Sequence, residues 1–143
     1  MTETNQREVE RIFGCAPFIA GLGLQLVSIA PGECHSSLLL GERHLQQDGY
    51  VHAGVQATVA DHTAGAAAAS LIGGGQRVLT VEFKINLLRT AQGRMLTCAA
   101  KVLKPGRTLI VVESELSCAS EGASRLVAKA SVTLAVVSAP TAR

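Results

Sequence analysis

The chain has 143 residues, the length of one ordinary domain, and its 48% hydrophobic residues can bury a core without metals or disulfides. Its 13 basic and 11 acidic residues leave a net charge of only +2 and form no run, so the composition carries no nucleic-acid footprint. Three Phe, one Tyr and no Trp also argue against base stacking, which makes small molecules the expected partners.

Targeting signals and paired cysteines are not evident. The N-terminus is polar and mixed in charge, and no apolar run reaches the length of a membrane span, so neither a signal peptide nor a membrane partner is expected. The four cysteines lie far apart and form no CxxC pair, which favours free, buried thiols. We therefore expect a soluble cytoplasmic protein.

The first part of the chain predicts a short helix and a hairpin. Residues 5–13 place apolar side chains at helical spacing, so a helix is expected within residues 1–16, and the Pro and Gly residues that follow should break it. Residues 22–29 and 33–40 alternate as strands do, and the Pro31-Gly32 turn between them favours a hairpin.

The longest helix is expected over residues 53–72, after a polar loop at 41–50. Nearly all its residues are small and apolar, so it should be buried on more than one side and wrapped by a sheet. Asp61 is its only carboxylate, and a buried acid needs hydrogen bonds, a positive partner or a proton. Asp61 is therefore the first candidate for chemistry.

Four strands are expected after the helix, at residues 77–88, 94–103, 107–119 and 124–137. Short turns separate them, which predicts an antiparallel meander. Residues 138–143 are expected to form a loose tail. Two strands, a buried helix and four strands contain no alternation of strand and helix, so the pattern predicts an α+β domain with an antiparallel sheet.

Two motifs resemble those of a known family. The run GYVHAG from Gly49 to Gly54, followed by Asp61, resembles the HGG…D signature of the PaaI-like (phenylacetyl-CoA-type) hotdog acyl-CoA thioesterases, and residues 102–109 resemble a late hairpin of that family. The resemblance implies one hotdog domain over residues 1–143, with an antiparallel sheet wrapped around a central helix. It also implies hydrolysis of an acyl-CoA to a free acid and CoA.

The start of the long helix is the expected electrophilic end of the site. The first amides of a helix lack intrahelical partners and lie at the positive end of its dipole, where they can polarise a carbonyl oxygen. The resemblance assigns this role to the amides of Ala53 and Gly54, although the family usually has Gly in place of Ala53. The alternative is that this motif only starts a helix.

Asp61 is expected to activate water as a general base or to take the acyl group as a nucleophile, roles that the resemblance supports. The alternative is a buried acid of structural role. Asp61 follows Ala53 by eight residues. That spacing is about 12 Å along a helix, so one thioester carbon cannot touch both groups of one chain. We therefore expect a homodimer with shared sites, which the resemblance implies is often doubled to a homotetramer.

The resemblance gives three further residues a supporting role. Gln46 lies where relatives carry an Asn that holds the water, and Thr80 lies where a Ser or Thr hydrogen-bonds near the thioester. His52 is part of the motif and is expected to contact the substrate or cap the helix, but not to act as the base. The alternatives are a passive loop residue for Gln46 and an ordinary strand residue for Thr80.

CoA carries phosphates, which need cations at the mouth of the site. The resemblance points to Arg89, Lys104 and Arg107 as a group, although each also fits an ordinary exposed charge. No metal is expected, because adjacent helix positions such as Asp61 and His62 point about 100° apart. No cofactor is expected beyond CoA as part of the substrate.

Two other functions stay open on the same fold. One is a non-catalytic acyl-CoA binding or sensor protein, in which Asp61 is unused. The other is an enoyl-thioester hydratase or dehydratase, which typically relies on a His and Asp pair at a spacing absent here. The acyl group of a thioesterase substrate is expected to be medium-chain or aromatic, and the residues do not choose between these.

Overall fold

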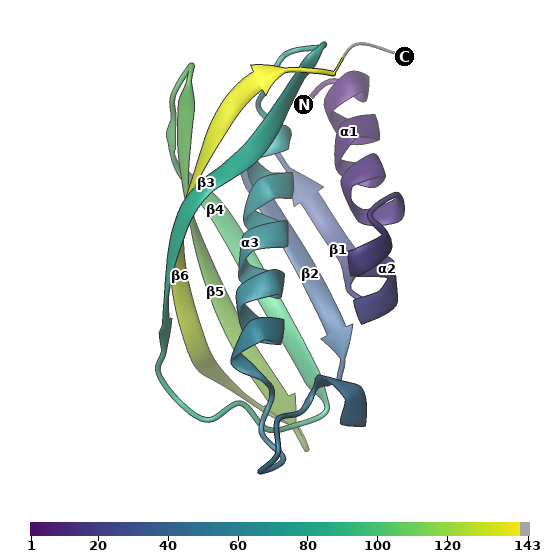
Figure 1. The fold of residues 1–143 in the computed structure, drawn as a ribbon, viewed down its shortest axis with the longest axis vertical. Helices are drawn as coiled ribbons and strands as arrows, with labels where there is room; N and C mark the ends of the chain where they lie inside the picture. Colours follow the sequence, from purple (N-terminus) through teal and green to yellow (C-terminus); the bar gives the residue numbers. More distant parts are fainter. Residues whose placement is uncertain (141–143) are drawn as a thin grey trace.

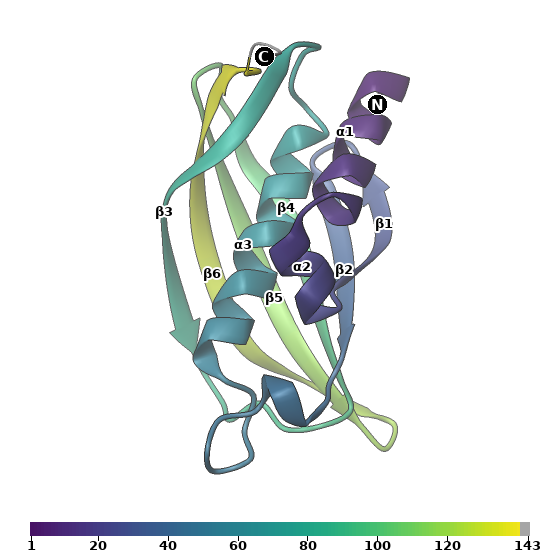
Figure 2. The same ribbon diagram turned by 45° about the vertical axis from the view of Figure 1, so that its right-hand side comes forward.

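The computed structural model describes residues 1–140 and shows a long helix enclosed by a curved sheet (Figure 1). Six strands form one antiparallel sheet in the order β1-β2-β4-β5-β6-β3. Helix α3 (Ala53–Ala69) lies along its concave face, while α1 (Glu3–Gly14) and α2 (Pro17–Leu22) lie beside α3 (Figure 2). This is the hotdog architecture, which confirms the expected fold class.

The remaining elements have the following bounds: β1 (Gln25–Ala30), β2 (Glu33–Leu39), a short 3-10 helix (Glu42–His44), β3 (Gln76–Leu87), β4 (Met95–Pro105), β5 (Leu109–Ser120) and β6 (Ala123–Ser138). Within residues 1–140, no helix has the length and apolar character needed to cross a membrane.

The strand order corrects the predicted four-strand meander. The β1–β2 hairpin is confirmed, and β4, β5 and β6 follow one another in the sheet. However, β3 pairs with β6 at the far edge, and residues 88–94 carry the chain back to β4 beside β2. The alternation of residues predicts a strand but not its neighbour. Here β3 covers a side of α3, so the sheet can close around the helix.

The segment before β1 is helical, where the sequence predicted a break and an early strand. Pro17 starts α2 at a position where a missing N–H costs nothing, and Gly23, with φ of 92°, ends it. The strand therefore begins at Gln25. Ser138, expected in the loose tail, instead pairs with Gln76 as the end of β6, and residues 141–143 of the tail lie outside the described residues.

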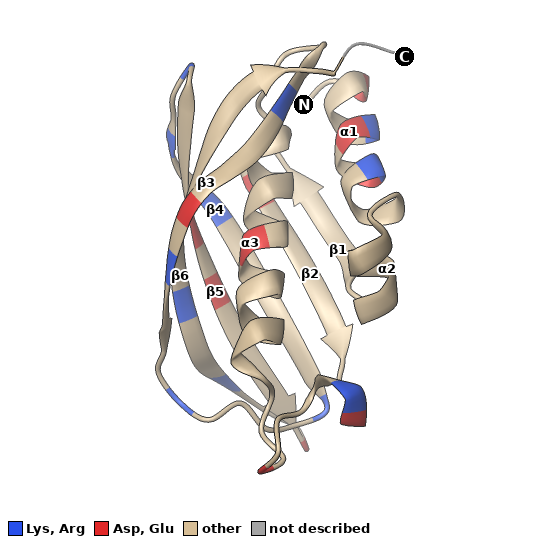
Figure 3. Cartoon of the chain, viewed as in Figure 1, with Lys and Arg blue, Asp and Glu red and all other residues tan. Residues whose placement is uncertain are grey.

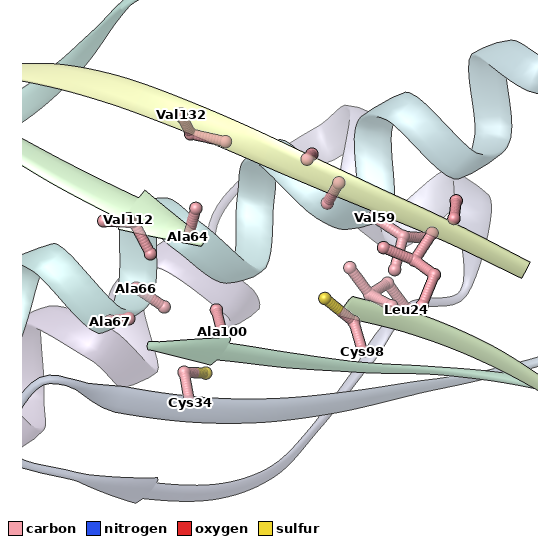
Figure 4. Packing of buried hydrophobic residues seen from close by; sticks show 14 of the residues in the cluster. Leu24, Cys34, Val59, Ala64, Ala66, Ala67, Cys98, Ala100, Val112 and Val132 are labelled. Carbon is pink, nitrogen blue, oxygen red and sulfur yellow. The ribbon is translucent and has the colours of Figure 1, made fainter. Parts of the chain in front are cut away.

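Small side chains let α3 lie close to the sheet. The fully buried alanines of its second half are Ala64, Ala66, Ala67, Ala68 and Ala69. The close-up of the core shows α3 packed against β4, β5 and β6 through residues such as Cys98, Val112 and Val132 (Figure 4). The helix ends three residues before the expected position, where the Asn5 side chain of α1 donates to the carbonyls of Ala69 and Ile72 at 3.2 and 2.7 Å.

Buried hydroxyl groups fix α3 on the sheet. Ser114 of β5 donates to the carbonyl of Ala60 at 2.8 Å, and the hydroxyls of Ser36 and Thr63 lie 2.7 Å apart in a hydrogen bond between β2 and α3. Leaving such a buried polar group unpaired costs about 1–3 kcal/mol, so these contacts resist sliding or rotation of the helix. They flank Asp61 in sequence and thereby set its position.

Strand β3 forms an open edge with apolar side chains. The register shifts between Thr80 and Glu82, so Val81 forms a bulge that breaks the strict alternation expected over residues 77–88. Leu79 and Val81 are 61% and 60% exposed. An uncovered apolar edge is a template for pairing with another chain, and β3 is one of the two edges of this sheet, opposite β1.

Candidate active site

The start of α3 holds one free amide. The ring Nδ1 of His52, the N-cap residue, accepts a hydrogen bond from the Gly54 amide at 2.8 Å. The amides of Val55 and Gln56 donate to the carbonyl of His52 at 3.0 and 3.2 Å. Within residues 1–140, the amide of Ala53 has no acceptor. Ala53 therefore offers a donor at the positive end of the helix.

Gly54 lies in the first turn of α3 as expected, but its amide already has a partner. Its amide is occupied by His52, so the pair of donors expected from the sequence is reduced to one. A Cβ atom at Gly54 would lie 3.0 Å from Nδ1 of His52, so glycine leaves room for the capping ring. The structure thus shows His52 as a cap, and its contact with a substrate stays a prediction.

A pocket of about 370 Å³ opens at this helix end and contains Gln46, His52, Ala53 and Arg89 among its lining residues. The side-chain oxygen of Gln46 accepts hydrogen bonds from the amides of Asp48 and Tyr50, so it holds the loop before the helix together. Its NH₂ group remains as a donor within the described part of the chain. The structure therefore brings Gln46, His52, Ala53 and Arg89 to one place.

Gln56 is a residue of this pocket that the sequence did not single out. Its Nε2 donates to the carbonyl of Val51 at 3.2 Å, and because that carbonyl only accepts, the orientation of the amide is fixed. Its Oε1 is buried without a partner among residues 1–140. The only sequence signal was a polar residue on an apolar helix, which does not reveal burial.

Asp61 lies two turns further along α3, as the single acidic position on that helix (Figure 3). It is half-buried, so the expectation of a carboxylate enclosed in the core is wrong. Thr80 of β3 donates its hydroxyl proton to Oδ1 of Asp61 at 2.7 Å, which leaves Oδ2 without a partner in the described residues. Strand β3 thus brings Thr80 to Asp61 and occupies Oδ1, so Oδ2 is the carboxylate oxygen left for other contacts.

His62 does not join Asp61. Its Nε2 lies 3.0 Å from the carbonyl of Ile12, and its ring packs edge-to-face on Phe13 with centroids 4.8 Å apart. Burial lowers the pKa of His62, which favours the neutral ring. His62 therefore anchors α1 on α3. Within residues 1–140, no three His, Cys, Asp or Glu side chains gather as metal ligands.

Two hollows flank Asp61. One, of about 310 Å³, is lined by residues of α1, α3 and β3 that include Arg11 and Thr80. The other, of about 380 Å³, is lined by residues of α2, α3 and β3 that include Phe18 and Phe83. Neither shares a lining residue with the pocket at Ala53. Ala53 and Asp61 of one chain therefore line separate hollows.

The three cations expected at a CoA site do not form one group within the chain. Arg89 lines the Ala53 pocket and donates to the carbonyl of Leu126 at 2.9 Å. Lys104 and Arg107 are exposed on the β4–β5 hairpin. Arg89 lies about 20 Å from Lys104 and Arg107, because the β3–β4 connection and the β4–β5 hairpin lie at opposite ends of the sheet.

Three of the four thiols are buried as expected, whereas Cys15 is exposed. Burial raises the pKa of Cys34 to about 12 and that of Cys98 to about 11, and it also raises the pKa of Cys118. These thiols stay protonated well above neutral pH. We expect DTNB to label one thiol per native chain and all four in denaturant, measured by absorbance at mildly alkaline pH. Prompt labelling of two or more native thiols would contradict this burial.

Known proteins that are similar to this chain indicate its family. The family model of the thioesterase superfamily matches residues 48–133, which include Ala53, Asp61 and Thr80. A 1,4-dihydroxy-2-naphthoyl-CoA hydrolase of Listeria monocytogenes is 29% identical over 100 residues, which cover 70% of this chain and 81% of that protein.

Two solved structures extend the similarity to the whole fold. A thioesterase family protein from Silicibacter pomeroyi is 35% identical with a TM-score of 0.92, and the match covers 94% of this chain and 98% of that one. A proposed thioesterase from Ralstonia eutropha, described as related to phenylacetic acid degradation, is 26% identical with a TM-score of 0.75, over 89% of this chain and 98% of that one.

Proposed function

The chain belongs to the thioesterase superfamily, and on this premise we propose that it hydrolyses an acyl-CoA to a free carboxylic acid and CoA. The observation that carries the proposal concerns residues 1–140, where the Ala53 amide and Oδ2 of Asp61 both lack a partner and open on separate hollows. A polarising donor and a base or nucleophile are the two groups that thioester hydrolysis requires.

We propose that the Ala53 amide of one copy of the chain meets the Asp61 carboxylate of another copy. The amide and the carboxylate are separated by about 12 Å along one rigid helix, so they cannot serve the same carbon. A two-fold axis that pairs β3 with its symmetry copy would bury the exposed edge and bring one Ala53 toward the other Asp61. We propose a homodimer, and the homotetramer implied by the resemblance as the larger assembly.

In the proposed reaction, the Ala53 amide donates to the thioester oxygen as negative charge develops there. Asp61 of the other copy takes a proton from water, whose oxygen forms the new C–O bond before the C–S bond breaks and the proton passes to the sulfur. Alternatively, the Asp61 carboxylate attacks the thioester carbon and the C–S bond breaks to release CoA thiolate. Water then hydrolyses the anhydride, which regenerates the Asp61 carboxylate and releases the free acid, while the thiolate takes up a proton from that water. In both proposed routes Thr80 donates to Oδ1 of Asp61, and the NH₂ group of Gln46 donates to the water.

The CoA end is proposed to lie at the Ala53 pocket, where Arg89 can pair with a phosphate and His52 lies at the rim. Lys104 and Arg107 would reach this end only from another copy. CoA enters as part of the substrate, and no other cofactor is proposed. The names of two relatives support a PaaI-like subfamily and an aromatic acyl group. A medium-chain acyl group and a cytoplasmic location stay predictions.

A panel of acyl-CoA substrates tests this function. We expect release of free CoA thiol, followed with DTNB, from at least one medium-chain or aromatic acyl-CoA, because the site has a donor and a carboxylate. A loss or gain of enoyl absorbance without thiol release would contradict hydrolysis and indicate a hydratase or dehydratase. Tight binding of acyl-CoA without turnover, measured by calorimetry, would indicate a non-catalytic acyl-CoA binding or sensor protein.

A further inference from the structure

The side chain of Gln56 carries a buried hydrogen-bond acceptor that has no partner. Gln56 is 4% exposed, and its Oε1 is the one buried side-chain nitrogen or oxygen of residues 1–140 without a hydrogen bond. Folded proteins satisfy nearly all such groups, because a buried acceptor has lost the bonds that it made to water. A single exception in the lining of the Ala53 pocket therefore indicates a place where a bound donor completes the bonding.

The Gln56 oxygen cannot turn to another partner without losing a bond. Nε2 of the same amide donates to the carbonyl of Val51 at 3.2 Å, so turning the amide over would place Oε1 against another oxygen. The amide of Val51 donates in turn to the carbonyl of Ala91 at 2.8 Å, which ties it to the β3–β4 connection. Oε1 of Gln56 is therefore a preorganised acceptor.

Gln56 lies on the same face of α3 as Ala53, at the end of the helix beside the loops in Figure 1. Residues three apart on a helix are neighbours, with about 5–6 Å between their Cβ atoms. Both residues line the pocket of about 370 Å³, and the Ala53 amide has no acceptor within residues 1–140. A ligand therefore meets a donor that needs an oxygen and, one turn away, an acceptor that needs an N–H or O–H group.

The other polar side chains near this helix end act mainly as donors. Nδ1 of His52 accepts from the Gly54 amide, so the neutral ring carries its proton on Nε2. Arg89 can only donate, and the side-chain oxygen of Gln46 is already bonded to two loop amides. Among these side chains of the pocket, Gln56 alone offers an unpaired acceptor.

An acyl-CoA carries a matching pair of groups. Its thioester carbonyl is followed by the sulfur, two methylene groups and the first amide of the pantetheine arm, whose N–H is the nearest donor on the CoA side. With the thioester oxygen at the Ala53 amide, this short flexible link allows the N–H to reach a residue one turn along the helix.

We propose that Oε1 of Gln56 accepts a hydrogen bond from this pantetheine N–H and so fixes the thioester beside the Ala53 amide. The assignment rests on the proposed function, because it places the thioester oxygen at Ala53. It makes Gln56 a substrate-binding residue that reads the amide next to the sulfur.

Two truncated substrates that differ by one group test this bond. One is the N-acetylcysteamine thioester of the acyl group that is released fastest from CoA, and the other is the matching thioester of 2-mercaptoethyl acetate, in which an oxygen replaces the N–H. We expect the wild-type chain to prefer the first about tenfold in kcat/KM, because the ester oxygen has no proton for Oε1. A wild-type ratio near one would overturn the proposal.

Gln56→Met shows whether this preference comes from Gln56. Methionine has a similar length but no amide oxygen, so the ratio should fall to near one. Loss of the bond to Val51 would lower kcat/KM for both substrates alike and would leave the ratio unchanged. Gln47→Met, the same substitution in the exposed loop outside the pocket, is the matched control and should keep the tenfold ratio. A tenfold ratio in folded Gln56→Met, checked by circular dichroism, would overturn the proposal.

Binding of unreactive ligands separates this proposal from the hydrolysis itself. Acetonyl thioethers of the same two thiols keep a carbonyl oxygen but contain no thioester, and calorimetry should show about tenfold tighter binding of the amide form to the wild-type chain only. If no acyl-CoA released thiol, the hydrolysis would be wrong, while this difference would still support Gln56. Thiol release without the difference would overturn the proposed bond alone.

A hydroxyl group on the acyl chain is the other source of a donor. Comparison of 3-hydroxybutyryl-CoA with butyryl-CoA tests it, and we expect Gln56→Met to leave the ratio of their kcat/KM values unchanged. If Gln56→Met instead changed this ratio and not that of the truncated pair, the donor would belong to the acyl group and the assignment to pantetheine would be wrong.

Discussion

Replacing Ala53 with proline is expected to lower kcat about 10²–10³-fold, the usual effect of removing one oxyanion donor. Proline has no N–H, and the first position of a helix is where it fits best. His52 already has φ of −59° and ψ of 137°, the extended backbone that a residue before proline adopts. The substitution therefore deletes a single donor. Thiol release at saturating substrate measures the loss, and circular dichroism checks the fold.

Ala53→Gly is the matched control for this variant. It keeps the N–H and removes only a methyl group at an exposed position, so its kcat should stay within a few-fold of the wild-type value. Equal activity of Ala53→Pro and Ala53→Gly would remove the Ala53 amide from the mechanism.

Asp61→Asn is expected to lower kcat by about 10²–10⁴-fold if Asp61 is the general base, and further if it is the nucleophile. Asparagine has nearly the same shape, and its side-chain oxygen can still accept the Thr80 hydroxyl, so the chain should fold and assemble as before. Asp48→Asn, in an exposed loop, is the control for loss of one negative charge. Full thiol release by Asp61→Asn would exclude the carboxylate.

The same two variants show whether two copies share a site. In a dimer that joins Ala53→Pro with Asp61→Asn, one site carries both substitutions and the other carries neither. Random mixing makes half of the dimers mixed, so refolding the variants together should restore about a quarter of the wild-type activity. If each chain instead held a complete site, every site in the mixture would carry a substitution and no activity would return.

The long helix and most of the strands could be predicted because their signals are local. A run of small apolar residues from Ala53 shows a buried helix, and alternation shows strands, whatever the rest of the chain does. The position of β3 could not be predicted in this way, because a strand's neighbour depends on which side of α3 lacks cover. The same holds for Val81, since a bulge is visible only once two strands are paired.

The residues of the candidate site also differ in whether local sequence could predict them. The motif pointed to Ala53 and Asp61, and the resemblance to the family added Thr80. The structure brings Asp61 and Thr80 into contact. Helix α2 was missed because Pro17 and the glycines near it indicate a break in the chain's helical pattern. Gln56 was missed because its unpaired oxygen exists only through burial by distant parts of the chain.

The hydrogen bond between Thr80 and Asp61 joins the edge strand to the helix, and this has a consequence for a newly synthesised chain. The strand that would meet a second copy is also the one that orients the carboxylate. On the proposed arrangement, a chain leaving the ribosome carries half of each of two sites and is inert toward thioesters. Activity would then begin with the encounter of two copies, so the abundance of the protein would itself regulate when hydrolysis starts.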